Sequence, residues 1–371
     1  MHREHHPMSG QPVSLSEIKK DMTINFLIEN LGSSGIEARN VADGARLYKT
    51  MIDSGDCIAL GAAGIFAVVG MGGYVLQLMK RGFIDWVCTT GAQAYHDLHH
   101  AYGFPVVQGN PHKGDDYLRE KGVVRIFDTY ISEKKTLLAQ DKVIQEFLRQ
   151  AEFEGTISSA DFNCALGEFV RKDAPHPEKS FIAQAAKYNV PVFLDSHSNH
   201  SIGINLAHSR LEGKIIDLSA DLDVLESAAL VHATGSDAFV ELGGGGPKNF
   251  IQQTGPTITQ ILGIEFEGAD RGLQITTALE RDGGLSGCTL NEAVTWKKYK
   301  HTGKNLVQIF GEYSVIFPLM CWYVVENCRP RERRGLLLRK KEFYNNLVAA
   351  AAEANLVGTL ERMDKLEKAG R

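Results

Sequence analysis

The sequence predicts an α/β fold, a single large domain in which helices flank a largely parallel sheet, and three observations predict it. Short apolar runs alternate along the chain with segments of helical period, as in βαβ folds. Several of these runs end in small or polar turns, such as LGAAG at 60–64 and LGGGG at 242–246. The 371 residues, 43% hydrophobic and 23% charged, are enough for a sizeable core.

The expected elements follow from local signals. Ser14 and Glu17 have the spacing of a capping box, which predicts a helix over 14–31 that stops at Gly32. A second helix is expected over 38–54. Residues 110–160 are more polar and indicate surface helices and loops, and a final helix is expected from Glu342 onward. Short apolar runs predict strands at 57–60, 86–89, 190–194, 228–234, 239–242 and 272–276.

The chain divides into three expected parts. Residues 1–13 have no apolar core of a signal peptide and are expected to form a mobile arm. The main domain would span 14–360, with a tail at 361–371. The uncharged run at 58–79 is long enough for a membrane span, but its five glycines favour a buried strand, a turn and a buried helix. We therefore expect no membrane association.

Charge and cysteine content exclude some classes of protein. A net charge of −5 does not suit a surface that coats nucleic acid or anionic membrane. The basic run at 329–341 is typical of a solvated linker or helix face, so no nucleic-acid partner is expected. The six cysteines include no CxxC pair, which argues against zinc ribbons and disulfide frameworks and indicates a cytoplasmic protein.

The stretch GGLSGCTLNEAVTWKK at 283–298 places Glu292, Trp296 and the pair Lys297–Lys298 after a glycine-rich turn. A lysine amine forms a Schiff base only when it is neutral, and burial beside an indole and a second ammonium would lower its pKa. This stretch is a candidate site for covalent chemistry. An exposed, amphipathic start of a helix, with the tryptophan on its buried side, is the alternative interpretation.

Two further features could bind ligands. The turn Gly243–Gly246, followed by Pro247 and Lys248, lies between an expected strand and helix, where backbone N–H groups suit a phosphate, although it does not fit GxGxxG. Two histidine-rich segments, YHDLHH at 95–100 and DSHSNH at 195–200, could ligate a metal, but neither has a complete ligand pattern. A metal-dependent hydrolase therefore stays a rival enzyme class, with pocket-lining polar residues as the simpler interpretation.

Taken together, these motifs resemble deoxyhypusine synthase, an NAD-dependent transferase of polyamine chemistry. The turn DGGLSG at 282–287 and the string NEAVTWKK at 291–298 are similar to the family's DGSDSG-type turn and DEAVSWGK. Further matches are VCTT at 87–90, NVPVF at 189–193, LGGG at 242–245 with Lys248, and FPL at 317–319. The similarity runs from about residue 27 to about 328, and the chain is identified as a member of this family.

The resemblance implies a modified Rossmann-like α/β domain, a homotetramer with active sites between subunits, and NAD bound in each. By motif position Lys298 would carry the imine, Trp296 would pack along the donor's carbon chain, and Glu292 would hold a cationic end. Positions that fall where the family contacts NAD are Thr89, Thr90, Gly244, Gly245, Thr277, Ala278, Asp282 and Glu312.

Departures from the family pattern concern the acidic positions. His96 stands where the family has a ribose-binding carboxylate, Asn249 replaces a histidine, and Leu285 replaces the second acid of DGSDSG. The segment that holds two acids in the family is 199–204 here and contains Asn199 and His200. A buried ammonium without its carboxylate costs several kcal/mol. We therefore expect a different amine to bind, and amide oxygens and aromatic faces would suit a planar guanidinium.

The expected function is the transfer of a four-carbon aminobutyl or guanidinobutyl unit, through an imine at Lys298, to a small amine, giving a homospermidine-type or agmatine-condensed product. The alternative is a true deoxyhypusine synthase, which takes spermidine as donor and modifies a lysine of a translation initiation factor. An NAD-binding protein without turnover is a third possibility, against which the intact Glu292, Trp296 and Lys298 argue.

Overall fold

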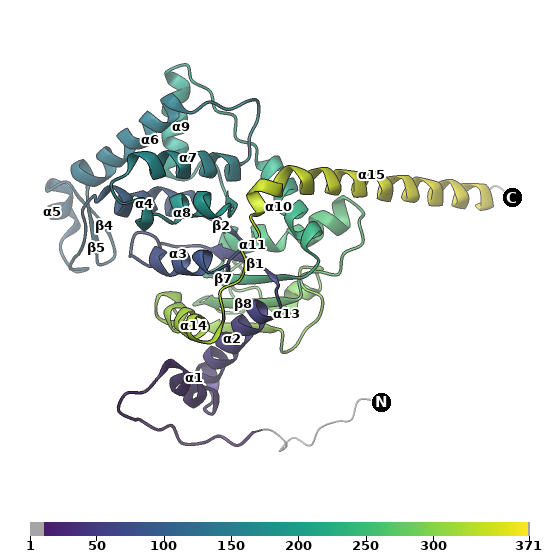
Figure 1. Cartoon of the computed structure of the whole chain (residues 1–371), viewed down its shortest axis with the longest axis horizontal. Coiled ribbons are helices and arrows are strands. Elements are labelled where there is room, and N and C mark those ends of the chain that lie inside the picture. The colour runs from purple at the N-terminus through teal and green to yellow at the C-terminus, as the bar shows by residue number, and fades with distance from the viewer. Residues whose placement is uncertain (1–10, 370–371) are drawn as a thin grey trace.

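A computed structural model describes residues 11–369, and it confirms the α/β fold (Figure 1). Its main sheet has six strands in the order β6-β2-β1-β7-β8-β9, and every neighbouring pair is parallel. The strands are β1 (Cys57–Ala62), β2 (Trp86–Thr89), β6 (Val192–Leu194), β7 (Asp237–Leu242), β8 (Arg271–Thr276) and β9 (Leu306–Phe310). Because all six run in one direction, their carboxyl ends meet at a single edge of the sheet.

Helices cover both faces of this sheet, as the alternation within β1 shows. Ile58 and Leu60 belong to one apolar core and Cys57 and Ala59 to the other, because successive side chains of a strand point to opposite faces. The first core includes side chains of α1 (Ile24–Gly32), α2 (Ile36–Asp53), α3 (Gly72–Lys80), α4 (Gly91–Tyr102), α6 (Leu138–Gln150), α7 (Ser159–Asp173), α8 (Phe181–Tyr188), α9 (Ser201–Leu211) and α14 (Tyr313–Asn327). The second includes side chains of α10 (Ala220–Thr234), α11 (Gly245–Gln252), α13 (Leu290–Val294) and α15 (Leu336–Ala369).

The polar segment expected as surface helices and loops also contributes two strands to a small antiparallel sheet of order β3-β5-β4. Its strands are β3 (Val106–Gln108), β4 (Val123–Ile126) and β5 (Thr129–Ser132), and α5 (Asp115–Glu120) precedes β4. The remaining short helices are the π-helical turns Glu133–Leu137 and Thr257–Ile261, the 3₁₀ turn Pro177–Lys179, and α12 (Thr254–Pro256). None of these elements extends the parallel sheet.

Two element predictions were wrong. The first helix begins at Ile24, capped by the Thr23 hydroxyl, and the residues around Ser14 and Glu17 are exposed and not helical. A capping box there has no apolar face to bury, and short helices need tertiary packing. The run 228–234, expected as a strand, is the second half of α10, whose side chains Leu230 and Val231 are buried in the second core.

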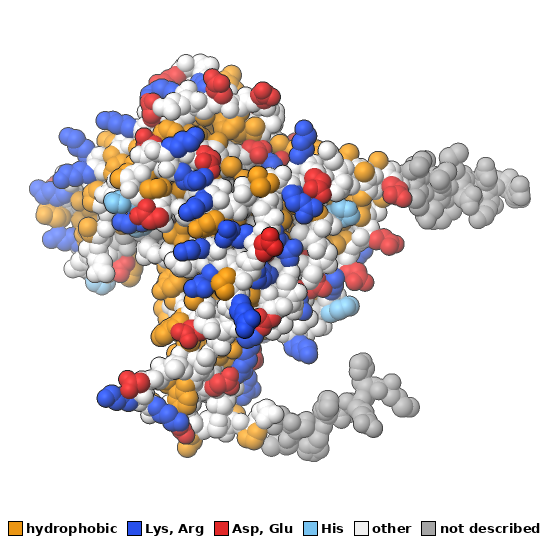
Figure 2. Space-filling model, viewed as in Figure 1, with side chains coloured by type: hydrophobic (Ala, Val, Ile, Leu, Met, Phe, Trp, Pro, Cys, Tyr) orange, Lys and Arg blue, Asp and Glu red, His pale blue; other side chains and the backbone are white. Residues whose placement is uncertain are grey.

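The uncharged run at 58–79 forms β1, a glycine turn and most of α3, as its glycines indicated. Within the part of the chain that the structure describes, no helix is long and apolar enough to cross a membrane. On the face seen in Figure 2, Lys and Arg side chains are interspersed with Asp and Glu.

Of the three expected parts of the chain, residues 1–10 of the arm lie outside the described residues. From 361 to 369, expected as a tail, the backbone continues α15.

Of the basic run at 329–341, residues 336–341 form the first turns of α15, as the helix-face interpretation expected, whereas residues 329–335 are not a solvated linker. Arg331 donates to the backbone oxygens of Gly82 and Asp56 and lies 3.1 Å from the carboxylate of Asp85, with Arg334 at 3.6 Å from the same carboxylate. Arg331 and Arg334 therefore hold residues 329–335 against the amino ends of β1 and β2, just before α15 begins. Long-range pairing of this kind gives no local sequence signal.

Asp237, the first residue of β7, makes stability depend on pH. It is buried, and burial raises its pKa to about 8, while Thr234 donates a hydrogen bond of 2.7 Å to it. An unfolded aspartate has a pKa of about 3.9, so between about pH 4 and 8 the folded state binds the extra proton. This group's contribution to stability therefore falls as pH rises through that window.

We expect Asp237→Asn to remove this decline. Urea unfolding of both proteins at pH 5 and pH 8 should show that the wild type loses more stability than the variant, by more than about 1 kcal/mol over that interval. Parallel pH curves for the two proteins would contradict a raised pKa at this position.

Candidate active site

The carboxyl edge of the parallel sheet gathers most of the sequence-predicted site residues. Thr90 follows β2, the turn Gly243–Gly246 follows β7, and Thr277 and Ala278 follow β8. Asp195 follows β6, the neighbour of β2 in the sheet, at the same edge. Ligands of open α/β sheets bind at this edge, so its side chains form the candidate site.

Lys298 reaches the site by way of a short helix and a tight turn. Thr289 caps α13, since its hydroxyl accepts from the Glu292 N–H at 3.0 Å. Lys297 then adopts φ +57°, and the Lys298 N–H donates back to the Ala293 carbonyl at 3.2 Å. This left-handed residue reverses the chain and leaves Lys298 only 7% exposed, although its neighbour Lys297 is exposed. The alternative of an exposed helix start therefore does not describe Lys298.

The Lys298 ammonium lies in a polar and mostly buried environment. Its Nζ donates to Oδ1 of Asn249, on α11, at 3.0 Å. Burial lowers its pKa, the charge of Lys248 adds to that effect, and Cys288 and the carboxylates of Glu241 and Glu292 oppose it. A lowered pKa increases the fraction of neutral amine at physiological pH, which is the form that attacks an imine or carbonyl carbon.

The causes of this shift differ in part from those that the sequence indicated. The indole of Trp296 is 55% exposed and does not bury the lysine. The second ammonium is Lys248, fifty positions away in the sequence, and not the adjacent Lys297. What covers Lys298 is the second core and α11, which only the fold brings together.

A buried polar network, which the sequence did not single out, lies beside Lys298. Lys248 is 2% exposed and donates to Gln274 Oε1 at 2.9 Å and to the Cys288 carbonyl at 2.6 Å. Gln274 in turn donates to the carbonyls of Gly243 and Ser286. The network ties the loop that precedes α13 to the glycine turn. Lys248 next to a glycine turn was the only sequence signal for it.

A second set of buried polar groups, centred on Glu241, adjoins the network of Lys248. Glu241 of β7 is buried and accepts from Gln252 at 2.7 Å and from the Tyr299 hydroxyl at 3.0 Å. Burial raises the pKa of this carboxyl, and Lys248 and Lys298 counteract the rise. A buried carboxylate near two ammonium groups balances their charge, so it helps to keep both lysines within the fold.

The glycine turn has the conformation that a close backbone approach requires. Gly243 and Gly245 have φ of +75° and +60°, which favours glycine. A Cβ on Gly244 would lie 2.4 Å from the Ser286 hydroxyl, and the Gly245 N–H donates to that hydroxyl at 3.0 Å. The loop of residues 283–288 therefore lies directly on this turn, at the start of α11.

The other positions predicted to contact NAD differ in accessibility. Thr277, Asp282 and Glu312 are exposed, and Glu312 caps α14 through the Ser314 N–H at 2.7 Å. Thr90 caps α4, whereas Thr89 is buried and donates to the Ala62 carbonyl of β1 at 2.8 Å. A pocket of about 940 Å³ near the end of β1 includes Glu312 among its lining residues. That volume is in the range of small-molecule and cofactor sites.

His96 is engaged within the helical layer. Its Nδ1 lies 2.9 Å from His99 Nε2, and the other ring nitrogen of His99 lies 3.3 Å from Gln140 of α6. Burial lowers the pKa of His96 to about 4 and that of His99 to about 3, so both imidazoles are neutral at physiological pH.

The positions predicted to bind substrate fall into two groups. Glu292, Trp296 and Leu285 are exposed around the Lys298 turn, and Asn199 is exposed at the end of β6. His200 is buried, and both of its ring nitrogens are occupied: Nδ1 accepts from the Gly203 N–H and Nε2 donates to the Ser196 carbonyl at 2.9 Å. His200 therefore caps α9 as a neutral imidazole.

The histidine segments do not assemble a metal site. Within residues 11–369, no three His, Cys, Asp or Glu side chains are grouped as metal ligands. His197 instead pairs with Asp223 at 2.7 Å, which raises its pKa. The metal-hydrolase interpretation thus has no site in the described chain.

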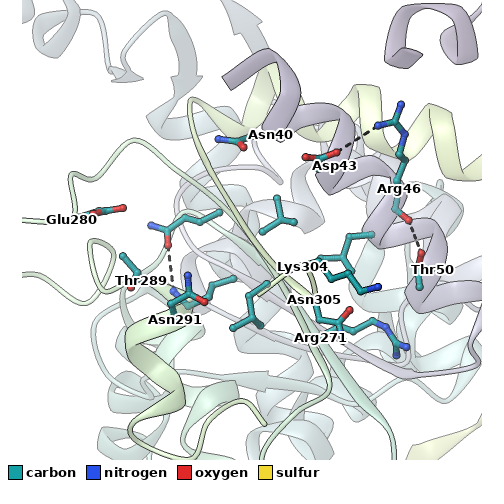
Figure 3. Close-up of a pocket in the computed structure, with 15 residues that line it drawn as sticks. Asn40, Asp43, Arg46, Thr50, Arg271, Glu280, Thr289, Asn291, Lys304 and Asn305 are labelled. Carbon is teal, nitrogen blue, oxygen red and sulfur yellow. Dashed lines mark hydrogen bonds and ion pairs between the residues drawn. The ribbon is translucent and has the colours of Figure 1, made fainter. Parts of the chain in front are cut away.

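A larger pocket of about 1060 Å³ includes Thr289 and Asn291 at the start of α13 but not Lys298 among its lining residues (Figure 3). The figure shows Asn40, Asp43 and Arg46 of α2 on one side and Arg271 and Lys304 on the other, and Asp43 pairs with Arg46. The pocket follows the edge strand β9 and contains none of the glycine-turn residues. Size alone therefore does not locate the candidate chemistry.

Comparisons with known proteins agree with the motifs. A family model described as deoxyhypusine synthase matches residues 26–324. The chain is 34% identical over 347 residues to a deoxyhypusine synthase-like protein of Nostoc sp., an alignment that covers 91% of this chain and 90% of the relative. It is 33% identical over 331 residues to a protein of Methanosarcina mazei named "Probable deoxyhypusine synthase 2", covering 89% and 94%.

A crystal structure from Entamoeba histolytica, of a protein assigned provisionally as a deoxyhypusine synthase, shares the fold. Its TM-score is 0.54 at 14% identity, over 84% of this chain and 96% of that chain. At this identity the likeness concerns the fold alone. Because the family model and the relatives cover most of the sequence, including the Lys298 motif, the chain belongs to the deoxyhypusine synthase family.

Proposed function

We propose that this protein is an NAD-dependent transferase that moves a four-carbon aminobutyl or guanidinobutyl unit, through an imine at Lys298, to a small amine. The observation that carries the proposal is the state of Lys298. Its amine is 7% exposed, its pKa is lowered by burial, and its Nζ is oriented by Asn249 at 3.0 Å. A neutral, oriented amine can displace another amine from an imine carbon and be displaced in turn by an acceptor.

The residues present fit NAD. The glycine turn at the end of β7 opens onto α11, but Gly244 and the Gly245 N–H face Ser286 of the same chain. The support for the cofactor therefore comes from the exposed residues around the turn. Exposed Thr277 and Asp282 and half-buried Ala278 would lie against the cofactor with Gly244 and Gly245, while Glu312 would reach it from the next strand end. When bound, NAD supplies the acceptor for a hydride from the carbon beside the donor amine. His96 would not contact the cofactor directly, since its ring is paired with His99, and would instead support the residues that do.

We further propose a homotetramer whose active sites lie between subunits. Trp296 is 55% exposed and Leu285 is 48% exposed, and both belong to the segment that ends at Lys298. Apolar side chains of this size at the mouth of a site suit contact with a second copy or with the substrate chain. Sedimentation of the purified protein would test the tetramer.

The proposal is tested by trapping. The protein is incubated with NAD and, separately, with spermidine, 1,4-diaminobutane or agmatine, reduced with borohydride, and weighed intact. An added butylamine or guanidinobutyl unit on Lys298 is the expected result, and no increment with any of the three amines would contradict the proposal. Transfer only when a translation initiation factor is supplied would instead establish a true deoxyhypusine synthase.

A further inference from the structure

A small pocket beside Lys298 has features that the proposed transfer does not yet use. Its volume is about 230 Å³. Whole ligands of ordinary size occupy roughly 300–1,000 Å³, so this pocket suits one end of a small molecule. It lies between the end of β6, α10 and α11, and its lining residues are Asp195, Val224, Ser227, Gly246, Asn249, Phe250, Gln253, Thr254 and Thr257. We refer to it as the Asp195 pocket.

The carboxylate of Asp195 has no cationic partner. Its Oδ1 is buried without a hydrogen-bond partner, and no Lys, Arg or His of the described chain forms an ion pair with it. Burial raises its pKa to about 6, opposed by nearby backbone N–H groups, so it is an anion at neutral pH. A carboxylate oxygen that is buried without a partner is costly to keep, and a cation that enters the pocket would reduce that cost.

The pocket and the lysine share a residue. Asn249 lines the Asp195 pocket, and its Oδ1 accepts from Lys298 Nζ at 3.0 Å. Gly246, one turn earlier on α11, lies against the carboxylate, because a Cβ there would be 2.0 Å from Asp195 Oδ2. Residues three apart on a helix share a face. The carboxylate and the reactive amine are therefore on the same side of α11.

We propose that Asp195 binds the cation at the far end of the donor's four-carbon chain while the near end reacts at Lys298. The inference rests on the proposed function and names its donor class: a chain that ends in a primary ammonium or a guanidinium. The neutral side chains Ser227, Gln253 and Thr257 line the same pocket and offer oxygens to the remaining N–H groups of such an end.

Calorimetry with three ligands tests this without any need for turnover. Wild type, Asp195→Asn and Asp116→Asn, each without NAD so that no hydride transfer takes place, are titrated with 1,4-diaminobutane, with agmatine and with butylamine, which lacks the distal cation. Asp116 is an exposed residue of α5 whose change alters the net charge equally. Removing a charged hydrogen-bond partner should weaken diaminobutane and agmatine binding to Asp195→Asn by about 10- to 100-fold, with butylamine unchanged.

A second variant, Thr257→Lys, tests whether a loss of binding in Asp195→Asn comes from a folding defect. Thr257→Lys places a tethered cation on the pocket wall and should weaken both dications as strongly as Asp195→Asn. Binding of diaminobutane and agmatine to Asp195→Asn as to wild type would overturn the inference. So would an equal loss for butylamine, or the failure of wild type to bind either dication.

The two proposals fail separately. If wild type binds the dications selectively but forms no adduct at Lys298, the proposed transfer fails and the Asp195 pocket stands. If adducts form at the same dication concentration in wild type and Asp195→Asn, the pocket assignment fails and the proposed transfer stands. If Asp195→Asn forms the adduct normally but no longer transfers the unit to the acceptor, Asp195 does not bind the donor and the pocket assignment also fails.

Discussion

Lys298→Arg is expected to abolish the borohydride-trapped adduct and reduce amine transfer by on the order of 10⁴-fold or more, as removal of a covalent nucleophile does. The guanidinium stays protonated at all physiological pH values and has no free lone pair for an imine. It can still donate to Asn249, so the cationic side chain and its partner are kept. Intact-mass analysis after trapping, together with a transfer assay, measures the effect.

The matched control is Lys297→Arg. Lys297 is the adjacent residue, and it is exposed where Lys298 is buried. We expect this variant to form the adduct normally, and we expect both variants to bind NAD as the wild type does. Turnover of Lys298→Arg at the wild-type rate would contradict the assignment of Lys298 as the residue that forms the imine.

The pH profile gives an independent check on the same lysine. Because burial lowers the pKa of Lys298, adduct formation should rise with pH and reach half its maximum below the value of about 10.4 for an exposed lysine. Rate measurements between pH 6 and pH 10 would show this. A midpoint at or above the ordinary value would mean that the amine is not desolvated in the working enzyme.

Most of the strand framework was predictable from sequence because its signals are local. The strands β1, β2, β7 and β8 are short apolar runs that end in glycine or threonine turns, and turns that bound a run of this length favour a buried strand. The run 228–234 has the same composition but is helical, since Ser219 caps a helix nine residues earlier and α15 packs over its apolar face. The length of the capped helix and its packing against α15 therefore decided the conformation of 228–234.

The candidate site was predictable in its motif and not in its environment. The Lys298 position followed from the string NEAVTWKK, yet its pKa depends on burial and on Lys248, which the fold brings close. Asp195 was grouped with His197 and His200 as a possible metal cluster. The structure separates them: His197 pairs with Asp223, His200 caps α9, and Asp195 faces α11. The three residues follow one strand, and the helices packed around its end, which sequence spacing does not encode, made that difference.

Lys340→Ala is expected to cause a large loss of stability, because Lys340 joins α15 to two other helices. Its Nζ lies 2.6 Å from Glu226 of α10, 2.7 Å from Asp161 of α7 and 3.0 Å from the Ser158 hydroxyl. Lys340 is 9% exposed and Glu226 6%. Removing one member of a buried ion pair leaves the other uncompensated, at a cost of about 3–5 kcal/mol. Thermal unfolding should show a Tm lower by roughly 10 °C.

The adjacent Lys341 provides the control, since it is exposed on the same turn of α15. Lys341→Ala should change the free energy of unfolding by less than about 0.5 kcal/mol. The double variant Lys340→Met/Glu226→Leu should regain most of the loss, because an apolar pair of similar volume avoids the unpaired charge. If the double variant is as unstable as Lys340→Ala, lost packing of α15 and not the stranded carboxylate is responsible.

The pH dependence of Lys340→Ala separates these two causes further. Burial already raises the pKa of Glu226, and Lys340 holds it down. Without the ammonium, the folded-state pKa of Glu226 rises further above its unfolded value of about 4.3, so the folded variant binds an extra proton. The deficit of the variant should therefore be smallest near pH 5 and grow as pH rises toward 8. A deficit that is the same at both pH values would show that charge at Glu226 does not set the loss.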